Sequence, residues 1–281
     1  MLASGAFMQV QSSLRWFVDN FSTIADWRAT LLRVAGFRGA VIGTDVMHHV
    51  ESRIAYKSGP PGRFSIDDLR IASPSGCTLL QEKHVEIKSA ERVLIVGESG
   101  TGKTLLFRTL AGLWPWGKGS IAYPDGEEIL YAPRTPYMPP GTLHEVLAYP
   151  KPAAMFDADL CSAALARVGL ERLSQLLDST HRWDRELNED EQHAVALARV
   201  LVHKAPWVLI DEVLDSLDDR ALDRFVDIFT KDLPQTSVIH IGRSDAHHMF
   251  SRTLHLVIDA TAKKLPVPTT PSAAPALATS P

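Results

Sequence analysis

Two runs of apolar residues stand out along the chain because they are continuous rather than alternating. Residues 92–96 read RVLIV and residues 207–210 read WVLI. Runs of this kind are typical of parallel β-strands that are covered on both faces. Apolar residues recur at helical spacing over residues 160–177 and 191–202, which predicts helices there. Strands and helices in this succession predict an α/β fold.

The N-terminal part of the chain has a different pattern. Residues 10–37 carry apolar side chains near helical spacing with charged residues between them, which predicts one long amphipathic helix with aromatics on its buried face. The sequence GPPG at 59–62 predicts a break after this region. We therefore expect three parts: a helical region over 1–58, a main domain over 59–262, and a disordered tail over 263–281 that is rich in proline, alanine, serine and threonine.

Composition narrows the class of protein. The chain has 281 residues, 45% of them hydrophobic, and a formal net charge of −4 without a long run of one sign, so we expect no nucleic-acid partner. The two cysteines, Cys77 and Cys161, match no metal-binding spacing. We expect neither a secretion signal nor a membrane-spanning helix, because no cationic start and no run of about 18 apolar residues is present.

The first apolar run leads directly into a candidate phosphate-binding loop. The sequence GESGTGKT follows residues 92–96 and precedes a helical pattern, which is the strand-loop-helix context of a P-loop. Its candidate nucleotide-binding residues are Gly97, Glu98, Ser99, Gly100, Thr101, Gly102, Lys103 and Thr104. Glycines let backbone N–H groups surround a phosphate, Lys103 would contact the β- and γ-phosphates, and Thr104 would ligate Mg²⁺. The alternative is a chance glycine-rich turn before a helix.

The second apolar run ends in two carboxylates. Asp211 would hold Mg²⁺ through water, and Glu212 would polarise the attacking water as a general base, which with Lys103 gives the candidate catalytic pair. Considered alone, the two residues would more often be a solvated acidic pair at the end of a strand than a catalytic pair. Their combination with a P-loop favours ATP and Mg²⁺ as ligands. The 106 residues between the motifs, 105 to 210, are unlike a small nucleotide kinase.

Over roughly residues 65–260 the chain resembles the nucleotide-binding domain of ATP-binding cassette (ABC) transporters. The resemblance rests on GESGTGKT, on LWPWG at 113–117, on PYMPPGTL at 136–143, and on WVLIDE followed by DSLD at 215–218. The sequences of these motifs are most similar to those of the subfamily of peroxisomal fatty-acyl transporters and their bacterial relatives, in which permease and ATPase share one chain. Residues 8–37 also resemble the helix that leaves the membrane in that subfamily, although any amphipathic surface helix would look similar.

The resemblance implies a P-loop ATPase with a mostly parallel core sheet, an antiparallel β-subdomain and a helical subdomain over roughly 150–200. It implies an ATP-binding subunit that hydrolyses ATP to drive transport, located peripherally at the cytoplasmic face of the inner membrane. The implied partners are a membrane-spanning permease, mostly absent from this chain, and a second ATPase domain in a homodimer or heterodimer. The transported substrate does not follow from this sequence.

Three departures from the family pattern support an alternative, an ATP-binding protein with little or no turnover that serves as a regulatory subunit or is a truncated remnant. Arg134 stands where the family has a glutamine, and Arg243 where it has a histidine that contacts the γ-phosphate; both remain candidate nucleotide-binding residues. Residues 188–190 read NED where the family signature reads SGG. At ~5 Å and an effective dielectric constant of ~20, each carboxylate facing the nucleotide would cost roughly 3 kcal/mol.

Overall fold

The computed structural model describes residues 2–48, 53–73, 76–243 and 247–259, which divide into two units. The first contains helix α1 (Leu2–His48), which confirms the predicted N-terminal helix and extends it at both ends. Apolar side chains of α1 such as Phe21 and Trp27 are exposed, although their spacing predicted a buried face. None of the described helices is long and apolar enough to span a membrane. The predicted disordered tail over 263–281 lies outside the described residues.

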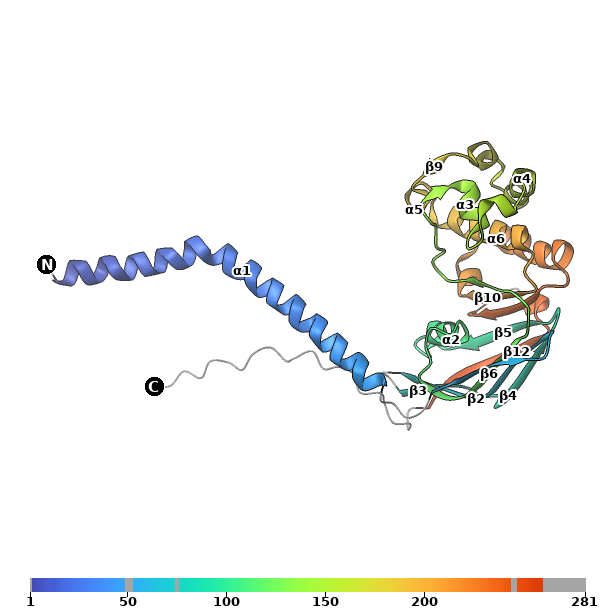
Figure 1. Ribbon diagram of the computed structural model, residues 1–281, viewed down its shortest axis with the longest axis horizontal. Helices are drawn as coiled ribbons and strands as arrows, with labels where there is room; N and C mark the ends of the chain where they lie inside the picture. Colours follow the sequence, from blue (N-terminus) through green and yellow to red (C-terminus); the bar gives the residue numbers. More distant parts are fainter. Residues whose placement is uncertain (1, 49–52, 74–75, 244–246, 260–281) are drawn as a thin grey trace. The chain divides into compact units, whose positions relative to one another are not determined.

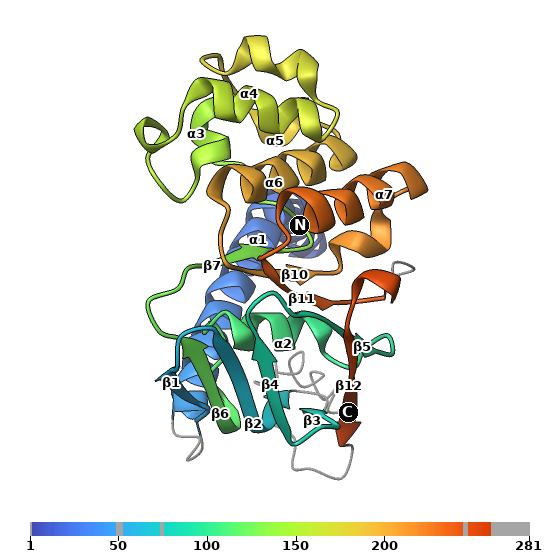
Figure 2. The same ribbon diagram turned by 90° about the vertical axis from the view of Figure 1, so that its right-hand side faces the viewer.

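The second unit, Ser52–Lys264, is built on one large sheet (Figures 1 and 2). Among the described residues, this sheet has ten strands in the order β1-β6-β2-β3-β12-β5-β11-β10-β7, with β4 paired to β2. The strands are β1 (Ala55–Gly59), β2 (Arg63–Ser73), β3 (Gly76–Leu80), β4 (His84–Lys88), β5 (Arg92–Gly97), β6 (Gly117–Pro124), β7 (Ile129–Ala132), β10 (Trp207–Asp211), β11 (Ser237–Ile241) and β12 (Arg252–Asp259).

The parallel half of the sheet runs β7-β10-β11-β5-β12. Every residue of β10 and β11 is buried, as expected for strands covered on both faces. The two apolar runs singled out in the sequence form β5 and β10, and β11 lies between them. The carboxyl ends of these parallel strands therefore meet at one edge, which brings the P-loop after β5 close to Asp211 at the end of β10.

The antiparallel half is formed by β2, β3, β4 and β6, so the predicted combination of a mostly parallel sheet with an antiparallel part is confirmed. Strand β4 alternates between buried and less buried residues, the pattern of a strand with one face toward the core. Strand β1 adds to the outer side of β6 in parallel, from Ala55 opposite Ser120 to Gly59 opposite Pro124. The sheet therefore begins before residue 59, where the sequence predicted the domain boundary, and residues 61–62 form the turn from β1 to β2.

Helix α2 (Lys103–Leu110) contacts both halves of the sheet, namely β10 and β11 of the parallel half and β2 of the antiparallel half. Its Leu106 and Leu110 are fully buried in a core shared with β2, β4 and β5. Two tyrosine hydroxyls satisfy carbonyl groups at its C-terminal end: Tyr56 donates to Thr109 O at 3.1 Å and Tyr123 donates to Leu110 O at 3.0 Å. This packing fixes the P-loop at the other end of the helix.

The predicted helical insertion is confirmed and lies at one end of the unit (Figure 2). It includes α3 (Leu143–Ala148), α4 (Ala158–Arg167), α5 (Trp183–Glu186), α6 (Glu189–His203) and the short pair β8 (Gly141–Thr142) and β9 (Thr180–His181), and α7 (Asp219–Asp227) follows β10. Buried Arg199 of α6 ties this part together, because its guanidinium donates to Val146 O at 2.8 Å and Tyr137 O at 3.1 Å. Burial lowers the pKa of Arg199 to about 10.

Candidate functional site

The P-loop forms a tight turn between β5 and α2, which confirms the strand-loop-helix context. Gly102 has a φ of 94°, and a Cβ there would lie 2.7 Å from Thr78 Oγ1, so the position requires glycine. Two hydrogen bonds brace the loop: Thr101 Oγ1 donates to Glu98 O at 2.8 Å, and Thr78 Oγ1 donates to Thr101 O at 2.9 Å. The loop therefore has its shape before any phosphate arrives.

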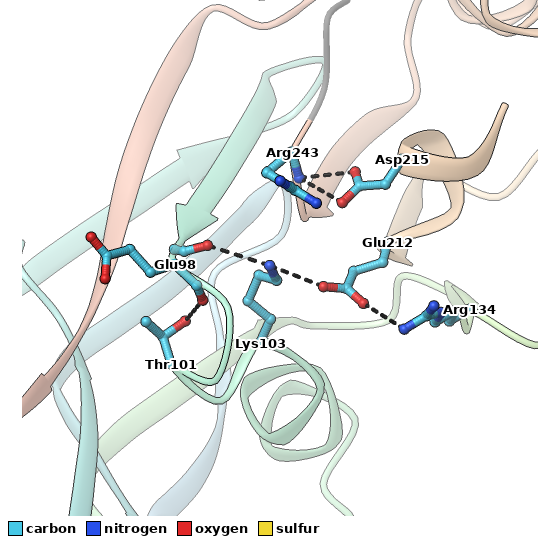
Figure 3. Close-up of polar contacts among 8 residues, drawn as sticks. Glu98, Thr101, Lys103, Arg134, Glu212, Asp215 and Arg243 are labelled. Carbon is cyan, nitrogen blue, oxygen red and sulfur yellow. Dashed lines mark hydrogen bonds and ion pairs between the residues drawn. The ribbon is translucent and has the colours of Figure 1, made fainter. Parts of the chain in front are cut away.

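The remaining loop residues lie around this turn. Gly97 is the last residue of β5, while Ser99 and Gly100 are exposed at the tip. Gly100 has a φ of 83°, a second left-handed position. The side chain of Glu98 points to the opposite side of the loop from Lys103 (Figure 3), so the structure gives Glu98 no role beyond its backbone.

Lys103 and Glu212 meet across the edge of the sheet (Figure 3). Lys103 Nζ lies 3.0 Å from Glu212 Oε1 and donates to Gly97 O at 3.3 Å. Arg134, on the loop after β7, approaches from the other side, with Nη1 3.2 Å from Glu212 Oε2. The two partners differ in burial, since the Lys103 side chain is 9% exposed and that of Arg134 is 71% exposed. Both oxygens of the Glu212 carboxylate are thus paired with a cation.

The backbone of Glu212 is held in an uncommon conformation. Its φ is 52°, in the left-handed region that is unfavourable for a residue with a side chain, and its N–H donates to Ile241 O at 2.8 Å. A conformation of this kind costs about 1 kcal/mol or more and persists only where the surroundings impose it. Here the hydrogen bond to β11 fixes the turn after β10, which directs the Glu212 side chain toward Lys103.

Asp211 is a buried carboxylate beside the P-loop, with 2% of its surface exposed. Burial raises the pKa of Asp211 to about 6, the neighbouring Glu212 adds to the rise, and a hydrogen bond with the Thr104 side chain opposes it. Its Oδ1 has no hydrogen-bond partner in the described part of the chain. A buried, unpaired carboxylate oxygen next to a threonine hydroxyl is a donor set that suits Mg²⁺, so Thr104 and Asp211 fit the metal predicted from the sequence.

Arg243 lies at the same edge of the sheet, just beyond β11, but its contacts are made by its backbone. Its N–H donates to both carboxylate oxygens of Asp215, at 2.8 and 2.9 Å (Figure 3). The Arg243 side chain is exposed. Asp215 thereby links the turn after β10 to the turn after β11. The sequence analysis quoted Asp215 within DSLD without giving it a role, because its partner is 28 residues away in the chain.

The segment that replaces the family signature starts helix α6. Asn188 and Glu191 form a reciprocal cap in which Glu191 N donates to Asn188 Oδ1 at 2.9 Å and Asn188 N donates to Glu191 Oε2 at 3.1 Å. Glu191 also pairs with Arg172. Glu191 thus serves the helix start, whereas Glu189 and Asp190 are exposed in the first turn. Two negative charges therefore remain on the surface of this segment.

Buried His193 connects this helix to the loop that carries Arg134. Its Nε2 lies 2.9 Å from Arg134 O, and since a carbonyl oxygen only accepts, Nε2 carries the proton. The sequence analysis missed both this contact and that of Thr78 with the P-loop, because no local pattern marks a residue that acts across 59 or 23 positions. Lys103, Thr104, Arg134, Asp211, Glu212 and Arg243 were all expected at the site, and the structure brings them to the same edge of the sheet.

Comparison with known proteins agrees with this geometry. Residues 80–215 match the family model described as ABC transporter. The chain is 34% identical over 188 residues to an uncharacterized ABC transporter ATP-binding protein of Haemophilus influenzae, covering 67% of this chain and 31% of that protein. It is 28% identical over 242 residues to the inner membrane ABC transporter ATP-binding protein YddA of Escherichia coli, covering 86% of this chain and 41% of that protein.

Similarity extends to subfamily D and to solved structures. ABC transporter D family member 3 of Dictyostelium discoideum is 31% identical over 217 residues, covering 73% of this chain and 28% of that protein. A bacterial Atm1-family ABC exporter with ATP bound shares the fold with a TM-score of 0.56 at 21% identity, covering 76% of this chain and 39% of that chain. This chain thus spans 28% to 41% of the length of these relatives.

Proposed function

The domain around residues 80–215 belongs to the ABC transporter ATP-binding family, and on that premise we propose that this chain binds Mg-ATP and hydrolyses it to energise transport. The observation that carries the proposal is the contact of Lys103 with Glu212 at 3.0 Å, beside buried Asp211. A buried cation on a preformed phosphate loop thereby faces a carboxylate at the end of a core strand. This is the pairing that phosphoryl transfer to water requires.

Each residue at this edge has a distinct task in the proposal. The P-loop backbone and Lys103 bind the phosphates, so Lys103 exchanges Glu212 for nucleotide. Thr104 and Asp211 hold Mg²⁺, which when bound neutralises charge on the β- and γ-phosphates. Glu212, released from Lys103, orients and polarises the attacking water. Arg243 offers an exposed guanidinium from the turn that Asp215 fixes.

The surroundings of the domain are also part of the proposal. Exposed apolar side chains along α1, including Phe21, Trp27 and Phe37, favour a permease domain as the partner of that helix. With such a partner the chain would lie at the cytoplasmic face of the inner membrane and would pair with a second ATPase domain. The similarity to YddA, whose name describes an inner membrane transporter, supports this location.

The test is titration of the purified chain with a fluorescent ATP analogue in the presence of Mg²⁺, followed by phosphate release. Lys103→Ala should weaken binding at least about tenfold, because it removes the charge that faces the phosphates. Lys118→Ala, at an exposed lysine of β6, is the matched control and should bind as the wild type does. Equal affinity in the wild type and Lys103→Ala would refute the assignment. Glu212→Gln should retain binding but lose phosphate release.

A further inference from the structure

The Glu212 carboxylate holds two cations that differ in what else they can do. Lys103 lies on the P-loop, is almost buried, and also donates to Gly97 O. Arg134 lies on a different element, is largely exposed, and approaches the opposite oxygen of Glu212 (Figure 3). Its backbone is held by the hydrogen bond from His193, so the loop is anchored independently of the P-loop. Movement of one cation therefore does not require movement of the other.

Nucleotide binding would separate these two contacts. Phosphate oxygens would compete with Glu212 and Gly97 O for the three N–H donors of Lys103, so nucleotide binding weakens the contact between Lys103 and Glu212. Glu212 would then face two like charges, the phosphates and the adjacent buried Asp211, with 17% of its own side chain exposed. Of the cations that contact Glu212 in the described part of the chain, only Arg134 is free of a role in the P-loop.

We propose that Arg134 is a positioning residue for Glu212: it retains the carboxylate when Lys103 moves to the nucleotide, and it promotes ATP binding through Glu212 rather than by touching the phosphates. The proposal rests on the function proposed above. It assigns Arg134 a role different from the direct nucleotide contact expected from the sequence. A positioning role predicts that Arg134→Gln has little effect on binding once Glu212 has lost its charge. Direct contact with the nucleotide predicts that the effect of Arg134→Gln is undiminished.

The experiment is a double-mutant cycle on the full chain, measured as the dissociation constant for a fluorescent Mg-ATP analogue. Arg134→Gln is introduced into the wild type and into Glu212→Gln. We expect it to weaken binding roughly 5- to 10-fold in the wild type but less than about twofold in the Glu212→Gln background, since no carboxylate is then left to neutralise. Arg134→Lys retains the charge, so its affinity for the Mg-ATP analogue should stay within about twofold of the wild type.

Arg243→Gln is the matched control, because this arginine lies at the same edge of the sheet but contacts Asp215 through its backbone N–H. Its effect should be the same in both backgrounds. Equal weakening by Arg134→Gln in both backgrounds would show that Arg134 contacts the nucleotide and would overturn the inference alone, as would no weakening in either. Absence of Mg-ATP binding by the wild type would overturn the proposed function and the inference together.

Discussion

At the scale of single residues, Asp211 shows how the site is maintained at the expense of stability. A carboxylate with 2% exposure and an unpaired Oδ1 is unfavourable in its charged form, and its pKa of about 6 reflects that cost. Because the pKa is raised above that of the unfolded chain, the destabilisation develops as the pH rises from about 4 to about 6 and is fully present at pH 7. A bound cation would remove it.

Replacing Asp211 by asparagine should therefore stabilise the nucleotide-free protein. The rise in pKa from 3.8 to about 6 corresponds to an upper bound on the order of 3 kcal/mol at pH 7. We expect a melting temperature several degrees above the wild type and loss of the stabilisation that Mg-ATP gives the wild type. Thermal unfolding with and without Mg-ATP measures both effects. A variant less stable than the wild type at pH 7, or one still stabilised by Mg-ATP as strongly, would contradict this account of the residue.

His240 gives the opposite pH dependence from the same cause. It is fully buried on β11, both ring nitrogens lack a hydrogen-bond partner among the described residues, and burial lowers its pKa to about 3. Below about pH 6.5 the unfolded chain takes up the proton and the folded chain does not, so stability is lost as the pH falls toward 3. His240→Leu should remove about 2 kcal/mol of the difference in unfolding free energy between pH 6.5 and pH 5.

Urea unfolding at several pH values measures this, with exposed His84 replaced by leucine as the control. Comparison with the wild type separates His240 from Asp211, whose contribution changes in the other direction over part of this range. Parallel pH profiles for the wild type and His240→Leu would contradict the prediction.

Much of this residue-level chemistry could be predicted from sequence, because the residues of each motif are neighbours in the chain. The glycines, Lys103 and Thr104 are consecutive, and Asp211 and Glu212 follow an unbroken apolar run. The pairing of Arg134 with Glu212 could not be predicted, because it depends on the order β10-β7 in the sheet and on a rotamer. The register of the family pattern located Arg134 at the site, and only the structure identifies what it contacts.

At the scale of elements, the start of α6 combines helix stability with an unfavourable charge. The cap between Asn188 and Glu191 and the acids in the first turn stabilise the helix, while Glu189 and Asp190 leave negative charge where the family signature has glycines. The same residues thus stabilise the isolated domain and should hinder closure of a dimer around ATP.

We therefore predict slow turnover that improves when the signature is restored. The combined change Asn188→Ser, Glu189→Gly and Asp190→Gly should raise steady-state phosphate release several-fold and promote ATP-dependent dimers in a Glu212→Gln background. It should also lower stability by about 1 kcal/mol, because glycine is a poor helix former and the favourable charges are lost. Asn188→Ser alone, which keeps a capping side chain, is the control. Unchanged turnover and unchanged elution in size-exclusion chromatography would indicate an ATP-binding subunit without motor activity.

Strand β1 is an element that the sequence analysis assigned to the wrong part of the chain. Its residues, AYKSG, have no strict alternation and run directly into GPPG, so the pattern predicted a break where the structure has an edge strand. Pairing with β6 and the hydrogen bonds of Tyr56 at the end of α2 place it in the sheet. Tertiary pairing of this kind is not encoded in any short window of sequence.

At the scale of the whole molecule, the two units predict different behaviour in solution. Removing residues 1–51 should leave the unit Ser52–Lys264 monomeric, whereas the full chain should associate through the exposed apolar side chains of α1. A chain that starts at Pro60 also loses β1 and should be less stable by about 2 kcal/mol than one that starts at Ser52. Sedimentation velocity and thermal unfolding of the three chains test this. A monomeric full chain would remove the support for a permease partner on α1.

The hydrogen bond between His193 and Arg134 has a further consequence for how the domain responds to its surroundings. His193 lies on α6, whose first turn contains Asp190. Arg134 lies on the loop after β7, and its side chain pairs with Glu212. A displacement of α6 would therefore act on the backbone of Arg134, the residue proposed to position Glu212, through this 2.9 Å contact. Buried His193 thus joins the start of α6 to the loop of Arg134 within one domain.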